Sequence, residues 1–194
     1  MTRQRRQFLR GSGLVAIGAA GGWLLPRWLE QDPLLAQGGQ VDAEEQVKKL
    51  KLVLPPPQKS GNTLVPAVRV GEVLYVSGHG PTGADGKAVV GKVGQDLDVK
   101  QAQEAARLVG LRVLSVVRAE LGSLNKVVRL VKVLGMVNAV PDFKQQPQVI
   151  NGFSDLMVEV FGESAGKGAR SAVGMGSLPG GIPVEIEAIF QVKA

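Results

Sequence analysis

The sequence predicts an α+β domain of two layers, in which two helices cover one face of a mixed β-sheet. Two segments place apolar residues at helical spacing, and the segments around them are rich in β-branched residues or alternate between apolar and polar side chains. Their order along the chain is β-β-(β)-α-β-α-β-β. Because both helices lie on one face, the apolar residues of the other face need a cover, and we expect other subunits to provide it.

A hairpin is predicted at the start of the domain. Residues 65–70 and 73–77 are extended, and a tight turn at 71–72 joins them. The glycine-rich segment 78–94 follows as a loop that can include a short strand over 88–90.

The first helix is predicted to begin at Asp98, which can cap it together with Gln101 three residues further on. Apolar side chains then recur at helical spacing. These are Ala102, Ala105, Ala106, Val109, Val113, Val116 and Val117. Gly122 is a residue type that commonly follows a helix, so we expect the helix to end there.

One long strand and a second helix come next. Residues 126–137 are apolar on both faces, which is typical of an interior strand, and Pro141 breaks the extended pattern. Residues 146–161 are predicted to form the helix. Pro147 lies in its first turn, where proline is tolerated, and Gly162 ends it.

Two more strands complete the predicted sheet. Residues 169–175 and 184–192 are extended, and a turn rich in glycine and proline over 178–183 joins them. In the last strand, apolar residues alternate with polar ones. Glu185 and Glu187 therefore project from the same face.

The amino-acid composition excludes several kinds of site. The 194 residues contain no cysteine, which excludes disulfides, thiolate metal sites and cysteine nucleophiles, and one histidine does not make a transition-metal site. We therefore expect no metal and no cofactor. Residues 1–36 carry five of the 23 basic and two of the 17 acidic residues, which leaves 18 and 15, a net charge of +3. No dense basic run with stacking aromatics is present, so nucleic acid is not an expected partner.

Residues 1–36 are predicted to be a twin-arginine (Tat) signal segment. Arg5-Arg6-Gln7-Phe8-Leu9 fits the RRxFL pattern, and the uncharged run 11–25 is shorter than the ~20 apolar residues of a membrane span. Cleavage after Ala36 would release a periplasmic or other extracytoplasmic protein that meets the membrane only transiently through its leader. The alternative is an uncleaved amphipathic anchor, with Trp23 and Trp28 at the membrane surface.

Residues 37–63 are predicted to be an N-terminal extension or linker. Within it, a short helix is expected over 42–50, and Pro55-Pro56-Pro57 favours an extended path. The folded domain itself is expected over 64–194.

Three segments carry polar and glycine residues that a scaffold alone does not require. They are 77–81, 168–173 and 184–188. Arg170 offers a planar guanidinium that matches a carboxylate with two hydrogen bonds. Glu185 can position a water if it lies near Arg170, and a hairpin between the last two strands would bring the two together. From the pattern alone, an ordinary cross-strand ion pair is the commoner explanation, and Glu187 can simply orient an arginine or lysine.

Several short motifs, in their order and spacing, resemble the signature of the YjgF/RidA family. They are Tyr75-Val76-Ser77-Gly78, Asn151, Ala169-Arg170-Ser171, Leu178-Pro179 and Val184-Glu185-Ile186-Glu187-Ala188. The resemblance covers about residues 45–194. The runs 151–155 and 170–178 are similar to the subgroup labelled endoribonuclease L-PSP/chorismate mutase-like.

The resemblance implies a chorismate-mutase-like fold of the bacillary type and a homotrimer with clefts between its subunits. Active members of the family hydrolyse enamines and imines, such as 2-aminoacrylate, to 2-keto acids and ammonia. In that scheme Arg170 binds the carboxylate of a small substrate, and Glu185 positions or activates the attacking water. Ser77, Gly78 and Asn151 shape the cleft.

The chain departs from the active branch of the family at three positions. Leu64 stands where that branch has an aromatic hydroxyl, His79 replaces the usual glutamine, and Ala172 stands where a cysteine is frequent. We expect His79 and Ala172 to lie beside the substrate, with His79 as a loop residue that titrates, binds ligand or hydrogen-bonds the loop. Two alternatives remain open, namely a non-catalytic trimer that binds a small carboxylate and an endoribonuclease of the L-PSP type.

Overall fold

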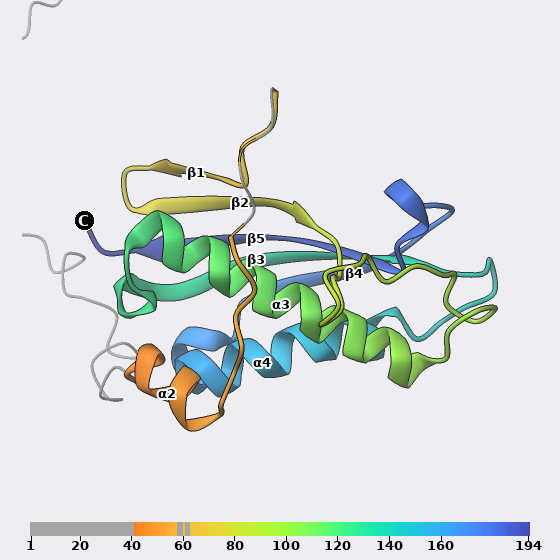
Figure 1. Ribbon diagram of the computed structural model, residues 1–194, viewed down its shortest axis with the longest axis horizontal. Coiled ribbons are helices and arrows are strands. Elements are labelled where there is room, and N and C mark those ends of the chain that lie inside the picture. Colours follow the sequence, from red (N-terminus) through yellow and green to blue (C-terminus); the bar gives the residue numbers. More distant parts are fainter. Residues whose placement is uncertain (1–40, 58–59, 61–62) are drawn as a thin grey trace, which may run out of the picture.

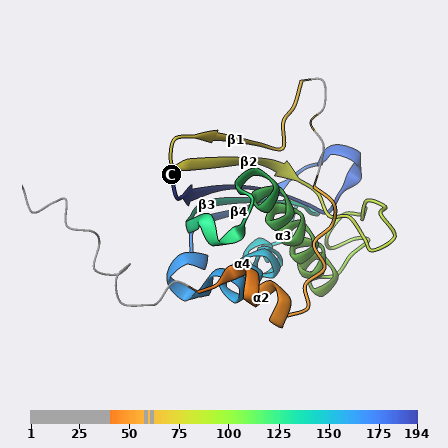
Figure 2. The same cartoon turned by 60° about the vertical axis from the view of Figure 1, so that its left-hand side comes forward.

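A computed structural model describes residues 41–57, 60 and 63–194, and its sheet has the strand order β1-β2-β5-β3-β4 (Figure 1). The strands are β1 (Ala67–Val70), β2 (Val73–His79), β3 (Val127–Asn138), β4 (Ala169–Met175) and β5 (Val184–Val192). β3 and β4 are parallel, and the other neighbouring pairs are antiparallel. Helices α3 (Val99–Leu121) and α4 (Gln146–Gly166) lie together on one face of the sheet (Figure 1 and Figure 2), which confirms the predicted α+β fold.

Both ends of α3 form as the sequence predicts. The Asp98 side chain accepts a hydrogen bond from the Gln101 backbone at 2.8 Å, and the Gln101 side chain accepts one from the Asp98 backbone at 2.9 Å. At the other end, Gly122 adopts a φ of 78°, which glycine reaches without steric cost. Local sequence therefore determines where this helix begins and ends.

Two glycines let α3 and α4 approach each other closely. A Cβ at Gly152 of α4 would lie 2.0 Å from the Gln103 carbonyl oxygen, and one at Gly110 of α3 would lie 2.7 Å from a methyl group of Leu156. Interiors of proteins are close-packed, so a larger residue at either position would push the helices apart.

α4 begins where it is predicted and changes course at its predicted end. Gly162 has a φ of 79° and a ψ of 171°, which interrupts the helical geometry, and a further turn then runs to Gly166. A Cβ at Gly162 would lie 2.8 Å from Val41. Glycine is therefore required both for the break in the helix and for the approach of the N-terminal segment.

The hydrophobic core lies between the helices and the sheet. In β5 the alternation is complete, because every second residue is buried against the helices. These residues are Val184, Ile186, Ala188, Phe190 and Val192. Glu185 and Glu187 lie on the opposite face of the strand, as their spacing predicts.

The face of the sheet away from the helices exposes apolar side chains. Val68, Tyr75 and Val173 are 49%, 48% and 38% exposed. Val68 pairs with Tyr75 and Tyr75 pairs with Ile189, so the side chains of Val68, Tyr75 and Ile189 lie side by side on that face. We call it the open face.

The predicted linker packs onto the domain. Its helix α2 (Ala43–Lys49) lies against α4, and the chain then runs extended across α3 toward β1 (Figure 1 and Figure 2). The Ser115 hydroxyl donates a hydrogen bond to the Pro55 carbonyl at 2.6 Å, which fixes this path. The short helix and the extended proline segment are confirmed.

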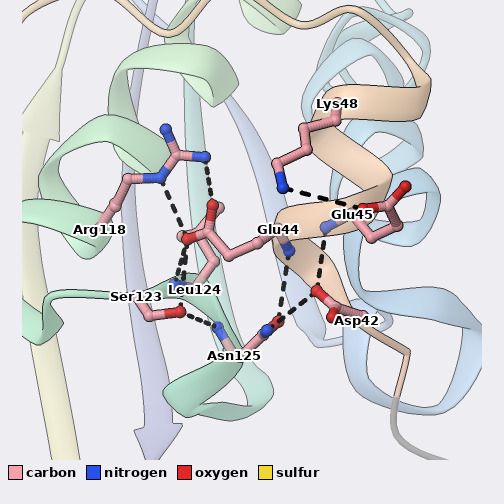
Figure 3. A network of polar contacts seen from close by, with 8 residues as sticks. All are labelled: Asp42, Glu44, Glu45, Lys48, Arg118, Ser123, Leu124 and Asn125. Carbon is pink, nitrogen blue, oxygen red and sulfur yellow. Dashed lines mark hydrogen bonds and ion pairs between the residues drawn. The ribbon is translucent and has the colours of Figure 1, made fainter.

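A polar network anchors α2 to the end of α3 (Figure 3). The Glu44 carboxylate accepts hydrogen bonds from Arg118 Nη2 at 2.7 Å, Arg118 Nε at 3.2 Å and the Leu124 backbone at 2.8 Å. Asn125 adds a hydrogen bond from its side-chain amide to Asp42 at 2.9 Å. Residues distant in sequence thus hold the N-terminal segment in place.

The predicted signal segment, with Arg5, Arg6, the cleavage position at Ala36 and the interfacial Trp23 and Trp28, lies outside the described residues. Within residues 41–57 and 63–194, no helix has the length and apolar character needed to cross a membrane.

Two local predictions are wrong. β1 starts at Ala67 rather than at residue 65, because Pro66 has no N–H to contribute to the ladder. The short strand over 88–90 is reduced to a single bridge between Thr82 and Ala88, since the turn at Gly86 leaves little chain to pair.

Candidate functional site

Arg170 lies on β4, on the side of the strand that faces α4. Its Nη1 donates hydrogen bonds to Asn151 Oδ1 at 2.8 Å and to Ser154 Oγ at 3.0 Å. The side chain is exposed, and no acidic residue of the described chain forms an ion pair with it. A guanidinium carries five N–H donors, so most of its capacity stays available to an anion.

Glu185 lies on β5, with its side chain on the open face next to Gly78. A Cβ at Gly78 would lie 2.1 Å from Glu185 Oε1, so the carboxylate occupies the space that a larger residue would fill. Within the described residues, this carboxylate accepts no hydrogen bond and forms no ion pair. It is therefore free to hold a water or a substrate hydrogen.

The structure does not bring Arg170 and Glu185 together, and the expected hairpin between the last two strands is wrong. β3 separates β4 from β5, because β5 enters the sheet between β2 and β3. Arg170 pairs with Val133 and Glu185 pairs with Met136, three residues along β3. The two Cα atoms are thus about 10 Å apart across the sheet and about 10 Å apart along it.

The two side chains also point to opposite faces of the sheet. Val133 pairs with Ala188, which is buried against the helices, so Arg170 projects on the helical side. Glu185 precedes buried Ile186 and projects on the open face. A site that uses both residues therefore needs two chains.

Two of the remaining predicted site residues make contacts that stabilise the fold. Ser77 donates its hydroxyl hydrogen to the Val65 carbonyl at 2.7 Å, which ties β2 to the chain before β1. Ala172 lies on the helical side of β4 and packs against the core. Asn151, by contrast, accepts the hydrogen bond from Arg170 and so fixes the guanidinium.

His79 is not the loop residue that its glycine neighbours predict. A bulge after Val76 extends β2 and pairs His79 with Ile186, and its side chain is only 2% exposed. Burial, as the larger cause, and the positive charge of Arg112 together lower the pKa of His79 to about 4, while a hydrogen bond with the Pro66 backbone acts in the opposite direction. The imidazole is therefore neutral near pH 7.

A pocket of about 1080 Å³ opens at the end of β2. Gly78, His79 and Glu185 line it, together with residues 51–56, α3 and the loop after β2. Arg112, whose Nη1 donates to the Thr82 hydroxyl inside this pocket, was not predicted from the sequence, because an arginine off the apolar stripe of a helix usually faces solvent. Ser154 was also missed, although its position three residues after Asn151 indicates the same helix face.

The fold and the sequence match a known family. The family model described as "YjgF/chorismate mutase-like, putative endoribonuclease" matches residues 49–179. The chain therefore belongs to the YjgF/RidA family, as the sequence motifs predict.

Individual relatives agree with this assignment. Protein TCP17 of Trypanosoma cruzi is 40% identical over 147 residues, which is 76% of this chain and 92% of that protein. The crystal structure of Atu1372 from Agrobacterium tumefaciens, a protein of unknown function, has 43% identity and a TM-score of 0.71, and the match covers 79% of this chain and 93% of that one. A "putative endoribonuclease" from Shewanella oneidensis shares the fold, with 24% identity, a TM-score of 0.73 and coverage of 78% and 100%.

Proposed function

We propose that the protein hydrolyses reactive 2-imino and enamino acids to 2-keto acids and ammonia. The observation that carries the proposal is the guanidinium of Arg170, which Asn151 and Ser154 hold in place and which has no carboxylate partner within the described residues. Such a group can bind a substrate carboxylate through two parallel hydrogen bonds.

The chemistry that this substrate needs is modest. Water adds to the carbon of the C=N bond, the resulting carbinolamine collapses to C=O, and the nitrogen leaves as ammonia with the hydrogens of the water. Glu185 accepts a proton from the attacking water and returns it to the departing nitrogen. An imine is already electrophilic, so orientation and one general base suffice.

Two chains must supply the two residues, and a homotrimer meets this need. Arg170 and Glu185 lie on opposite faces of one sheet, whereas a neighbouring subunit can present its Glu185 to the Arg170 of the first. The exposed apolar residues of the open face, such as Val68 and Tyr75, support a subunit interface there.

The test is the release of keto acid and ammonia from enzymatically generated 2-aminoacrylate. The wild-type protein should exceed the spontaneous rate, and Arg170→Met should return to it. Arg69→Met is the matched control, because Arg69 is an exposed arginine on the opposite edge strand, β1. Wild-type protein that does not exceed the spontaneous rate, or equal rates for wild type and Arg170→Met, would refute the proposal.

A trimer that binds a small carboxylate without turnover is the second candidate. Ala172 and Leu64, which replace reactive or polar residues of the active branch, favour it. Pyruvate should then raise the melting temperature of the wild type and not of Arg170→Met, with no turnover of imines. An endoribonuclease receives no support from the charge, since residues 37–194 carry a net charge of only +3.

Export by the Tat route is the proposed localisation. The twin arginines Arg5 and Arg6 and the uncharged run after them support it. Replacing both arginines by lysine should abolish recovery of the protein from the periplasm. Unchanged export of that variant would exclude the route.

A further inference from the structure

The pocket at the end of β2 has the size and walls of a small-molecule site. Its volume of about 1080 Å³ lies just above the ~300–1,000 Å³ typical of such sites. Its apolar walls come from Leu108 and Leu111 of α3, from Leu52 and Leu54 of the N-terminal segment, and from Ile182. An apolar ligand body would lose contact with water on several sides there.

The polar groups of the pocket favour an anion. Arg112 donates one hydrogen bond through Nη1 to Thr82, while its buried Nε has no hydrogen-bond partner. No described acid forms an ion pair with this guanidinium. Lys51 adds a second positive charge at the wall, and Glu185 is the single acid among the described residues that line the pocket. An unpaired charge that is partly removed from water gains most from a ligand of opposite charge.

The N-terminal wall of the pocket is fixed in place. Residues 51–56 form it, and the hydrogen bond from Ser115 to the Pro55 carbonyl holds one end at 2.6 Å. The other end follows α2, which the network of Glu44, Arg118 and Leu124 anchors (Figure 3). The pocket is therefore a built feature of the fold.

We propose that this pocket binds a monocarboxylate with a bulky apolar body, and that Arg112 holds its carboxylate. The site goes beyond the proposed deaminase function, because Arg170 does not line it. Gly78 and Glu185 also line the pocket, so its occupant would share a wall with the acid of the proposed reaction.

Isothermal titration calorimetry with octanoate and octanamide tests the proposal. Octanoate should bind the wild type saturably, and the neutral amide should bind roughly tenfold more weakly or worse, because it loses the charge-assisted hydrogen bonds. Arg112→Met keeps a long apolar side chain and should weaken octanoate binding by a similar factor. Lys100→Met is the matched control, because it removes an exposed positive charge from the same helix.

Two further variants make each outcome decisive. Arg170→Met should bind octanoate as the wild type does, which separates this site from the proposed reaction. Circular dichroism shows whether Arg112→Met folds. If it does not fold, Leu108→Trp still tests the site, because the larger side chain fills the pocket and should abolish octanoate binding. No saturable octanoate binding, equal affinity for octanamide, or full binding by a folded Arg112→Met or by Leu108→Trp would overturn the proposal.

Discussion

Glu44 and Glu45 offer a direct test of how the N-terminal segment is held. Both lie in the first turn of α2, so both interact with the same helix dipole, and replacement by alanine changes helix propensity equally at the two positions. Glu44 accepts three hydrogen bonds of 3.2 Å or less, from Arg118 and Leu124. Glu45 has only a 3.9 Å ion pair with Lys48, and these two side chains are 67% and 75% exposed.

The contacts translate into different losses of stability. Hydrogen bonds to charged groups contribute about 1.5–3 kcal/mol when buried, but the Glu44 and Arg118 side chains are 25% and 35% exposed, which reduces their contribution. We expect Glu44→Ala to lower the free energy of unfolding by about 2 kcal/mol. Glu45→Ala should cost less than about 0.5 kcal/mol.

Chemical denaturation of the two variants under identical conditions is the assay. A loss of 2 kcal/mol should also lower the melting temperature by about 4–8 °C. Limited proteolysis should cut Glu44→Ala faster within the N-terminal segment. Equal losses of unfolding free energy for the two variants would show that the network does not anchor α2. The network would then not hold the N-terminal wall of the pocket in place.

Three more measurements address other parts of the molecule. His79 is the single histidine, and its NMR titration in untagged protein should centre near pH 4, because burial and Arg112 lower its pKa from 6.5. The unfolded chain takes up the proton at a higher pH than the folded chain does. The contribution of neutral His79 to the free energy of unfolding is therefore complete above pH 6.5, and it falls toward pH 4 by up to ~1.4 kcal/mol per pH unit. His79→Gln should remove this part of the pH dependence of stability. An NMR titration of His79 centred above pH 6 would contradict the prediction. Gly152→Ala should lower stability by about 2 kcal/mol, because a Cβ 2.0 Å from a backbone oxygen brings the overpacking cost to the upper end of ~1–3 kcal/mol, against a ~1 kcal/mol gain in helix propensity. A neutral or stabilising result in denaturant unfolding would argue against the close contact of α3 and α4. Lys51→Gly should raise stability by about 0.5–1 kcal/mol, because Lys51 has a φ of 52° at the position after α2 where glycine is usual. A loss of stability in the same assay would contradict that reasoning.

Helix ends and strand alternation could be predicted because they depend on local chemistry. The capping box of Asp98 and Gln101 starts α3, and alternation in 184–192 assigns each residue of β5 to a face. The position of β5 in the sheet could not be predicted in this way. A strand with the same alternation can pair with β4 or with β3, and only the packing of the whole sheet decides between them.

In the candidate site, too, features that depend on distant segments of the chain could not be predicted from local sequence. Arg107, Arg112 and Arg118 look alike in the sequence, since all three lie off the apolar stripe of α3. In the structure Arg107 pairs with Glu159 and Arg118 pairs with Glu44, whereas Arg112 lines the pocket without an ion pair to any described acid. The partners come from distant segments, so no local pattern distinguishes the three. Burial of His79 depends likewise on a bulge that its sequence neighbours do not indicate.

We propose that Arg170 of one chain acts with Glu185 of another, because one sheet directs them to opposite faces. Arg170→Met and Glu185→Gln, each inactive alone, should regain activity when they are unfolded and refolded together. Random mixing in a trimer leaves about one cleft in four with both residues intact, so we predict about a quarter of the wild-type rate of imine hydrolysis. If both variants are inactive alone and their mixture also remains inactive, although mixed trimers are present, the claim is contradicted.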